Sequence, residues 1–178
     1  MATRVFIYFA VAVCTLLSVA EARTRHRPAA PGTPRQTVTA DSVVVYKAKR
    51  QLLLLKNNDT LKVYRVALSS SARGPKLRKG DKKTPEGRYI TDWRNQRSRF
   101  YRSLHISYPN EQDKLRADSL GVQPGGDIMI HGLMRGWGWL GKNHLVNDWT
   151  NGCIAVTNDE IKEIWRAVPN KTPVIIYP

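Results

Sequence analysis

Between residues 42 and 69 the chain carries three short apolar runs, SVVVYKAK, QLLLLKN and TLKVYRVALS, and these runs restrict its fold most. They are rich in β-branched residues or leucine, and each has the length of a strand. Asn57-Asn58-Asp59 is a strong turn signal between the second and third runs. The pattern predicts that the folded domain opens as an antiparallel meander.

The rest of the chain adds further short strands and few helices. Strands are predicted around 88–91 and within FYRSLHISYP, GGDIMIHG and KTPVIIYP, whereas NEQDKLRADSLG is compatible with a short helix or a polar loop. Thr157 and Glu160 have the spacing of a capping box, which predicts a helix beginning there. In this helix Trp165 is predicted to lie in the core. The fold class indicated is therefore mostly β.

The N-terminus reads as an export signal. A basic residue, an apolar stretch and the small-x-small pattern Ala20-Glu21-Ala22 predict a cleaved signal peptide over residues 1–22. Residues 23–40, rich in Pro and Arg, are expected to be a flexible basic linker, and residues 41–178 a single domain. After cleavage we expect no transmembrane segment, and a secreted protein of the periplasm or cell envelope.

The charge balance is strongly basic. The chain has 29 Lys and Arg against 14 Asp and Glu, a formal net charge of +15. Such a charge attracts anionic surfaces such as wall polymers, lipid head groups or nucleic acid. Because the chain is expected to be exported, nucleic acid is not an expected partner.

Signal cleavage removes Cys14 and leaves Cys153 as the one remaining cysteine. It is either a reactive thiol, half of an intermolecular disulfide or a buried apolar residue. A reactive thiol needs a nearby imidazole and backbone N–H groups that favour its ionisation. Gly152 permits a tight turn beside the sulfur. Among the histidines, His131 is the best candidate base, because it ends a predicted strand and precedes a glycine.

These residues carry a resemblance to a known family. IMIHG followed by TNGCIAV is similar to the signature of the L,D-transpeptidase catalytic domain (YkuD) family, and GDKKTPEGRYI resembles the loop and strand upstream of it. The loop itself reads either as an exposed charged connection or as a contact to substrate. The resemblance covers roughly residues 42–178. It implies a β-sandwich-like mixed sheet with a short helix after the nucleophile, and neither a cofactor nor a metal.

The resemblance also implies a role for each matching residue. Cys153 would be the nucleophile and His131 the general base and acid. The carbonyl of Gly132 would fix the imidazole tautomer, and the N–H groups of Gly152 and Cys153 would bind an oxyanion. The expected substrate contacts are Trp149, Thr150, Asn151, His144 and Arg135.

Three features depart from the common pattern of the family. Asn151 stands where a second histidine is usual, and Ala155 where many members have arginine. Recognition of a substrate carboxylate is therefore expected from Arg135 or Lys142. The spacing between His131 and Cys153 is slightly long, and the Trp-Gly segment inside it suggests a lid.

The implied activity is acyl transfer on peptidoglycan stem peptides through a cysteine thioester that an amine resolves. Alternatives within the enzyme class are an L,D-carboxypeptidase and an amidase that releases wall-anchored lipoprotein. Outside it stands a basic, non-catalytic wall-binding protein.

Three other groups of residues have alternative interpretations. A zinc site from Cys153, His131 and His144 lacks compact ligand spacing, and no spacing supports a glycosidase pair among Glu86, Asp127 and Asp148. The tryptophans at 137, 139 and 149 are compatible with stacking on sugars or with packing as a lid.

Overall fold

The computed structural model of the protein describes residues 38–178. The predicted signal peptide and all but the last three residues of the predicted linker lie outside the described residues. Within residues 38–178 every helix is too short or too polar to cross a bilayer.

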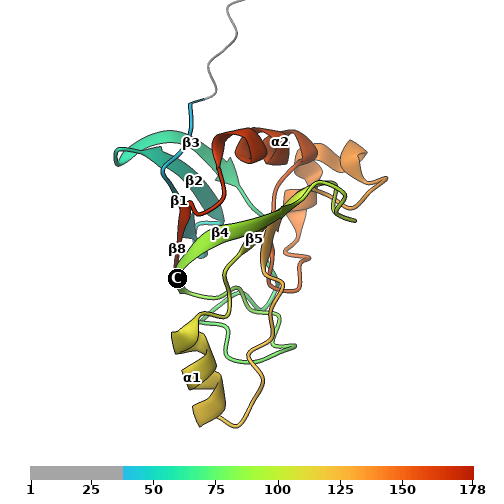
Figure 1. Cartoon of the computed structure of the whole chain (residues 1–178). Helices are drawn as coiled ribbons and strands as arrows, with labels where there is room; N and C mark the ends of the chain where they lie inside the picture. The colour runs from blue at the N-terminus through green and yellow to red at the C-terminus, as the bar shows by residue number, and fades with distance from the viewer. Residues whose placement is uncertain (1–37) are drawn as a thin grey trace, which may run out of the picture. The chain divides into compact units, whose positions relative to one another are not determined.

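The described chain is organised around one curled, mixed sheet of eight strands in the order β3-β2-β1-β8-β4-β5-β6-β7 (Figure 1). The strands are β1 (Ser42–Tyr46), β2 (Gln51–Lys56), β3 (Asp59–Arg65), β4 (Gly87–Asn95), β5 (Ser103–Ile106), β6 (Met129–His131), β7 (Ile154–Ala155) and β8 (Pro173–Tyr177). The predicted mostly β fold is confirmed.

The first three strands form the antiparallel meander that the apolar runs predicted. Asn57 and Asn58 both have positive φ, 50° and 67°, and these values suit the tight β2–β3 turn. The C-terminal strand β8 then pairs parallel to β1, with Val45 opposite Ile176. Both of these side chains are buried, so the two ends of the domain share one core.

The other half of the sheet begins at β4, which pairs with β8 on one side and β5 on the other. A register shift between Thr91 and Arg94 bends this shared strand. The chain leaving β3 then meets β7, because Ala67 and Ala155 exchange two backbone hydrogen bonds of 3.0 and 2.9 Å. The sheet therefore curls until the segment after β3 lies beside the segment that carries Cys153.

Helix α2 (Asn158–Ala167) follows β7 and begins at the predicted capping box. The Thr157 hydroxyl accepts from the amide of Glu160 at 3.2 Å, and the Glu160 carboxylate accepts from the amide of Thr157 at 2.9 Å. Trp165 packs against the core but is only partly buried, and the guanidinium of Arg94 lies over its ring, 4.3 Å from the ring centre. The prediction that Trp165 lies in the core is therefore only partly correct: the side chain contacts the core but is not fully buried.

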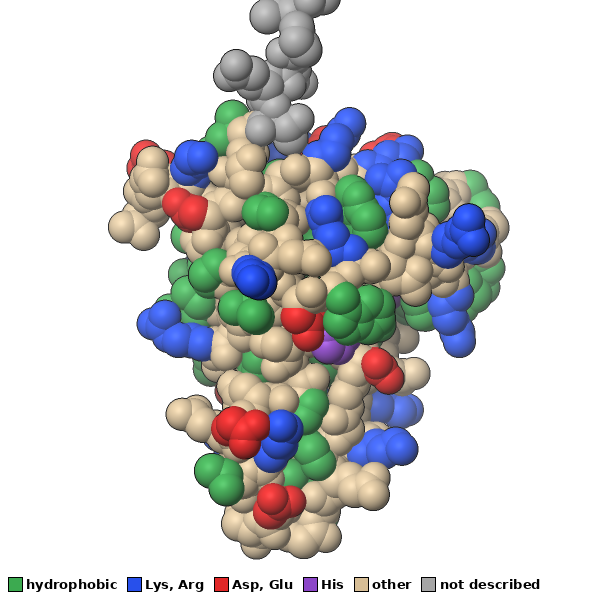
Figure 2. Space-filling model, viewed as in Figure 1, with side chains coloured by type: hydrophobic (Ala, Val, Ile, Leu, Met, Phe, Trp, Pro, Cys, Tyr) green, Lys and Arg blue, Asp and Glu red, His purple; other side chains and the backbone are tan. Residues whose placement is uncertain are grey.

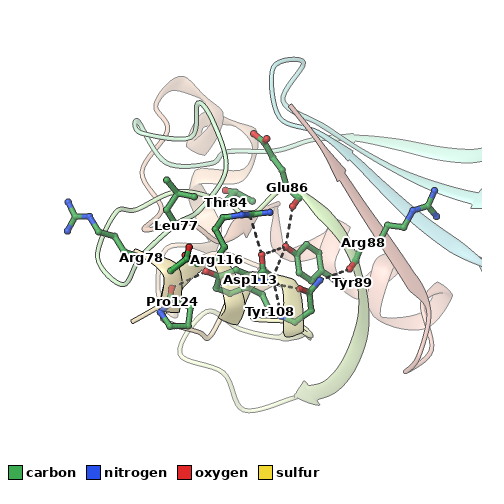
Figure 3. A network of polar contacts seen from close by, with 12 residues as sticks. Leu77, Arg78, Thr84, Glu86, Arg88, Tyr89, Tyr108, Asp113, Arg116 and Pro124 are labelled. Atoms are coloured by element: carbon green, nitrogen blue, oxygen red, sulfur yellow. Dashed lines mark hydrogen bonds and ion pairs between the residues drawn. The ribbon is translucent and has the colours of Figure 1, made fainter. Parts of the chain in front are cut away.

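Helix α1 (Glu111–Ser119) resolves the ambiguity of the segment 110–121 in favour of a helix (Figure 1). It is polar, and a buried network fixes its first turn to β4 (Figure 3). The Asp113 carboxylate accepts from the hydroxyl of Tyr89 at 3.1 Å and from the amide of Asn110 at 3.1 Å. Helix α1 lacks an apolar face. It is therefore attached to the sheet by hydrogen bonds to one buried carboxylate and not by apolar packing.

The Trp-Gly segment forms a 3₁₀ element, η1 (Gly138–Val146), that the sequence did not predict. Gly141 interrupts it with φ 47°, a backbone conformation that glycine tolerates. Basic side chains are spread over the face shown in Figure 2, interspersed with acidic ones and not gathered in one patch. On this face the net charge therefore marks no single binding surface.

Candidate active site

Cys153 lies at the end of a tight turn that needs a glycine. Gly152 has φ +116°, and a Cβ atom there would lie 2.6 Å from the carbonyl oxygen of Lys83. The Thr150 hydroxyl donates to the Cys153 carbonyl at 2.8 Å and accepts from the Gly152 amide at 3.3 Å. The turn is therefore closed from inside by Thr150 and covered from outside by the loop around Lys83.

The sulfur of Cys153 faces the chain before β6. Its thiol lies 3.4 Å from the carbonyl oxygen of Asp127, a geometry in which the S–H donates. Burial raises the pKa of the Cys153 thiol, and the nearby N–H of Met129 opposes this effect. The thiol is thus protonated at neutral pH in the resting protein. Burial has this effect because it disfavours the thiolate anion.

His131 ends β6 and is only 3% exposed. Its Nδ1 lies 2.6 Å from the carbonyl oxygen of Gly132. A carbonyl only accepts, so Nδ1 carries the hydrogen and Nε2 is the free acceptor. Burial, with a smaller contribution from nearby His144, lowers the pKa of His131 to about 4, although the hydrogen bond to Gly132 opposes this shift. A neutral imidazole with a free Nε2 has the protonation state that a general base requires.

The register of β6 and β7 relates the two residues. The strands are parallel, with His131 opposite Ala155, so the chain at Cys153 runs alongside Met129. Residues two apart on a strand share a face, which puts Cys153 and His131 on the same side of the sheet. Within residues 38–178 the two side chains make no direct hydrogen bond, and the thiol faces Asp127 instead. Transfer of the proton would need the sulfur to turn toward the ring.

An aromatic group surrounds the imidazole. The ring of Phe100 lies 4.4 Å from that of His131, and Trp149 lies 5.8 Å from His131 and 6.4 Å from His144, between ring centres. Trp149 and His144 also line a cavity of about 210 Å³. Sequence reasoning missed Phe100, since nothing in its local pattern distinguishes it from a core residue.

Asp81 organises the upstream loop. Its carboxylate accepts from the amides of Leu77, Arg78 and Lys83 at 2.8 to 3.1 Å, and from the Nζ of Lys76 at 2.7 Å. These contacts hold the pKa of Asp81 below its usual range, although burial alone would raise it. The charged loop is therefore an ordered wall against the Gly152 turn, and the sequence did not single out Asp81.

Asn158 is a second residue that sequence reasoning missed. Its Oδ1 accepts from the amide of Leu133 at 2.9 Å. The backbone packs so closely around it that a Cβ on Gly132 or Gly138 would lie 2.7 Å from its amide group. Asn158 therefore fixes both ends of the segment between the catalytic histidine candidate and η1. Its position at the start of α2 was the available signal, because such residues often bind neighbouring backbone.

The residues predicted to contact substrate are not all brought together. Asn151 and Trp149 are at the surface of the turn, but the Thr150 hydroxyl is used within it, so Thr150 shapes the turn and does not face a ligand. The Nε of Arg135 donates to the carbonyl of Ser98 at 3.0 Å. Arg135 also lines a different cavity, of about 290 Å³.

Lys142, the other residue expected to recognise a carboxylate, is exposed on η1. Ala155, which stands where many family members have arginine, is fully buried beside Ala67 and leaves no space for an arginine.

The three carboxylates considered for a glycosidase pair are separately placed. Glu86 pairs with the buried ammonium of Lys47 at 2.7 Å, and Asp148 pairs with Arg50 at 2.6 Å. Asp127 is exposed, and its backbone contacts Cys153. Within the described residues no three His, Cys, Asp or Glu side chains are grouped as metal ligands.

The chain matches a known protein family. The model of the L,D-transpeptidase catalytic domain family (YkuD) matches residues 40–176. The putative L,D-transpeptidase YafK of Escherichia coli K12 is 32% identical over 133 residues, which are 71% of this chain and 46% of YafK. The chain thus spans about half the length of this curated relative.

Solved structures show the same fold at lower identity. The helical cell shape determining protein Pgp2 of Campylobacter jejuni (K307A mutant) is 21% identical with a TM-score of 0.58, over 78% of this chain and 47% of that one. An L,D-transpeptidase from Xylanimonas cellulosilytica is 17% identical with a TM-score of 0.53, over 82% of this chain and 63% of that one. The family match, the curated relative and the Cys153–His131 geometry lead to one assignment: the chain belongs to the L,D-transpeptidase catalytic domain (YkuD) family.

Proposed function

We propose that the protein is a cysteine-dependent acyltransferase that acts on peptidoglycan stem peptides in the cell envelope. The observation that carries the proposal is the His131 imidazole, held neutral with Nδ1 bonded to the Gly132 carbonyl, on the same sheet face as the Cys153 thiol. Family membership supplies the substrate class, since the family is defined by L,D-transpeptidase activity.

In the first step the Cys153 sulfur attacks the carbonyl carbon at the L-centre of meso-diaminopimelate. The thiol proton passes to Nε2 of His131, and the imidazolium that forms is stabilised by its bond to the Gly132 carbonyl. The imidazolium then protonates the departing amine of the terminal D-amino acid. A thioester on Cys153 remains.

In the second step an acceptor amine attacks the thioester carbonyl. His131 takes the proton of the amine, and the sulfur leaves as a thiolate that this proton restores to a thiol. The product is a 3→3 crosslink. If water attacks instead, the product is a shortened stem peptide and the protein is an L,D-carboxypeptidase.

The oxyanion of each tetrahedral intermediate needs N–H donors. The Cys153 amide makes no hydrogen bond within residues 38–178, whereas the Gly152 amide donates weakly to Thr150. We therefore expect Cys153 N–H to be the main donor, and Gly152 N–H to contribute only if it leaves Thr150.

The alternative within the enzyme class is hydrolysis of the amide that joins a lipoprotein to the wall. The same thiol and imidazole serve that reaction, and only the scissile bond differs. The curled sheet and the Cys153 turn are equally compatible with it.

The test is a muropeptide analysis by liquid chromatography and mass spectrometry. Purified residues 23–178, as wild type or Cys153→Ala, are incubated with sacculi that do or do not carry bound lipoprotein. New 3→3 dimers or shortened stems made only by the wild type support the proposal, and lipoprotein release assigns the amidase reaction. Identical products from both proteins would show that Cys153 is not the nucleophile and would overturn the proposal.

A further inference from the structure

Three exposed apolar side chains lie in and next to η1, and we call them the η1 patch. Trp139 and Val146 are each 79% exposed, and Trp137 is 54% exposed. Trp139 and Val146 are outside the lining of the cavity beside Trp149, so they point to solvent instead of into that cavity. Apolar side chains that are exposed together mark an interaction site, whereas scattered ones are ordinary.

Three cations lie beside this patch without carboxylate partners, and we call them the η1 cations. Arg135 and Lys142 are exposed, and the Arg135 amide donates to the carbonyl of Arg99 at 2.9 Å, which brings a second exposed arginine next to the first. Within residues 38–178 none of the three pairs with an acidic side chain. Residues 128–147 contain neither Asp nor Glu. The η1 segment, drawn in orange in Figure 1, thus combines exposed apolar groups with positive charge.

This combination favours a lipid surface over the polar polymers of a cell envelope. A glycan offers sugar faces on which tryptophan can stack, but it offers no apolar phase to an exposed valine such as Val146. The boundary layer of a bilayer offers an apolar phase, and anionic lipids add negative head groups for the cations. Tryptophan suits this boundary because its ring enters the apolar layer while its indole N–H stays hydrated.

We propose that the η1 patch docks the protein on a membrane surface that carries anionic phospholipids. Trp139 and Val146 enter the boundary between head groups and acyl chains, and the η1 cations contact lipid phosphates. The inference takes from the proposed function only the location in the cell envelope. Residues 132–137 alone separate His131 from η1, so docking holds the candidate active site close to the lipid surface.

Co-sedimentation with vesicles tests the docking without turnover. Residues 23–178 are mixed with vesicles of phosphatidylcholine alone, or of equal parts phosphatidylcholine and phosphatidylglycerol. We expect much tighter binding to the anionic vesicles, weakened by high salt, with tryptophan fluorescence quenched by brominated acyl chains. Equal binding to both kinds of vesicle, or binding to neither, would overturn the proposal.

Trp139→Ala tests the apolar part of the patch. It should weaken binding to the anionic vesicles roughly 10-fold, because the indole no longer enters the boundary layer. Trp93→Ala is the matched control, since Trp93 is also exposed, at 41%, but lies on β4. It should bind like the wild type. The proposal is wrong if the two variants lose affinity equally or if Trp139→Ala loses none.

A pair of double variants tests the cations. Arg99→Gln with Lys142→Gln removes two η1 cations, and Arg65→Gln with Lys171→Gln removes two exposed cations elsewhere, so both proteins have the same net charge. The basic segment 23–37 is also the same in both. The first variant should bind roughly 10- to 30-fold more weakly than the wild type, and the second should lose far less. Equal losses would show that net charge alone attracts the protein, and would reject a docking surface at η1.

Vesicle binding and turnover can fail independently. Cys153→Ala should bind vesicles as the wild type does. Vesicle binding without Cys153-dependent muropeptide products would keep the docking surface and reject the acyltransferase. Cys153-dependent products without any vesicle binding would reject the docking surface alone.

Discussion

Mild acid should destabilise the protein through His131, and the size of the effect follows from its burial. The pKa of His131 is about 4 in the folded chain, against 6.5 for an exposed histidine. Because the folded state holds the ring neutral, the unfolded chain binds more protons across this window. The free energy of unfolding therefore falls as the pH decreases from 6.5 toward 4. Between pH 7 and pH 5 the expected loss from this residue is about 2 kcal/mol.

The measurement is urea unfolding at both pH values, monitored by tryptophan fluorescence, for the wild type and His131→Gln. Glutamine does not titrate, so the variant should lose about 2 kcal/mol less than the wild type over the same pH interval, whatever its stability at pH 7. His144 titrates in both proteins, and its contribution cancels in the comparison. An equal loss in both proteins would refute the argument that burial keeps the His131 ring neutral.

Three further substitutions or reactions test the site. Gly152→Ala should lower the free energy of unfolding by about 2 to 4 kcal/mol. Alanine is strained at φ +116°, and its Cβ would overlap the Lys83 carbonyl. Unchanged urea unfolding would contradict this prediction. Asp148→Ala leaves Arg50, at 2.6 Å, without its carboxylate, and we expect a loss of about 1 kcal/mol in the same assay, after allowance for solvent screening. Burial raises the pKa of Cys153, so iodoacetamide should alkylate this thiol more slowly at pH 7 than it alkylates free cysteine. Mass spectrometry over a pH series measures the two rates. A faster rate for Cys153 would indicate a thiolate in the resting protein.

Two control substitutions accompany these tests. Gly126→Ala puts a methyl group where no atom lies within 4 Å, and it should leave the free energy of unfolding unchanged. Asp159→Ala removes a fully exposed partner of Lys162, and we expect no measurable change from it. Together they separate effects of the Cys153 turn and the Asp148 pair from a general cost of mutation.

Local pattern was enough for much of the fold. The meander follows from apolar runs of strand length broken at Asn57-Asn58, and α2 follows from the Thr157–Glu160 capping box. The candidates Cys153 and His131 were also predictable, because one thiol beside a glycine and one histidine at a strand end carry the family signature. Each of these signals lies within a few neighbouring residues.

The surroundings of the site depended on contacts between distant segments. Phe100, Asp81 and Asn158 reach the Cys153–His131 region only after the sheet curls. Nothing near Phe100 or Asp81 in the sequence marks them, and Asn158 is marked only by its position at the start of α2. The 3₁₀ course of η1 was missed for a similar reason, since its aromatic residues have no strand or helix period.

The sequence by itself indicated Cys153 and His131 as the candidate reactive residues and determined which runs form strands. Only the tertiary structure decided their protonation, because the pKa values of His131 and Cys153 depend on burial by segments far away in the chain. It also decided that Thr150 closes the turn and that Nε2 of His144 is buried without a hydrogen-bond partner within residues 38–178. Strand and turn preferences act over a few residues, whereas desolvation and hydrogen-bond partners are set by the packing of the whole domain.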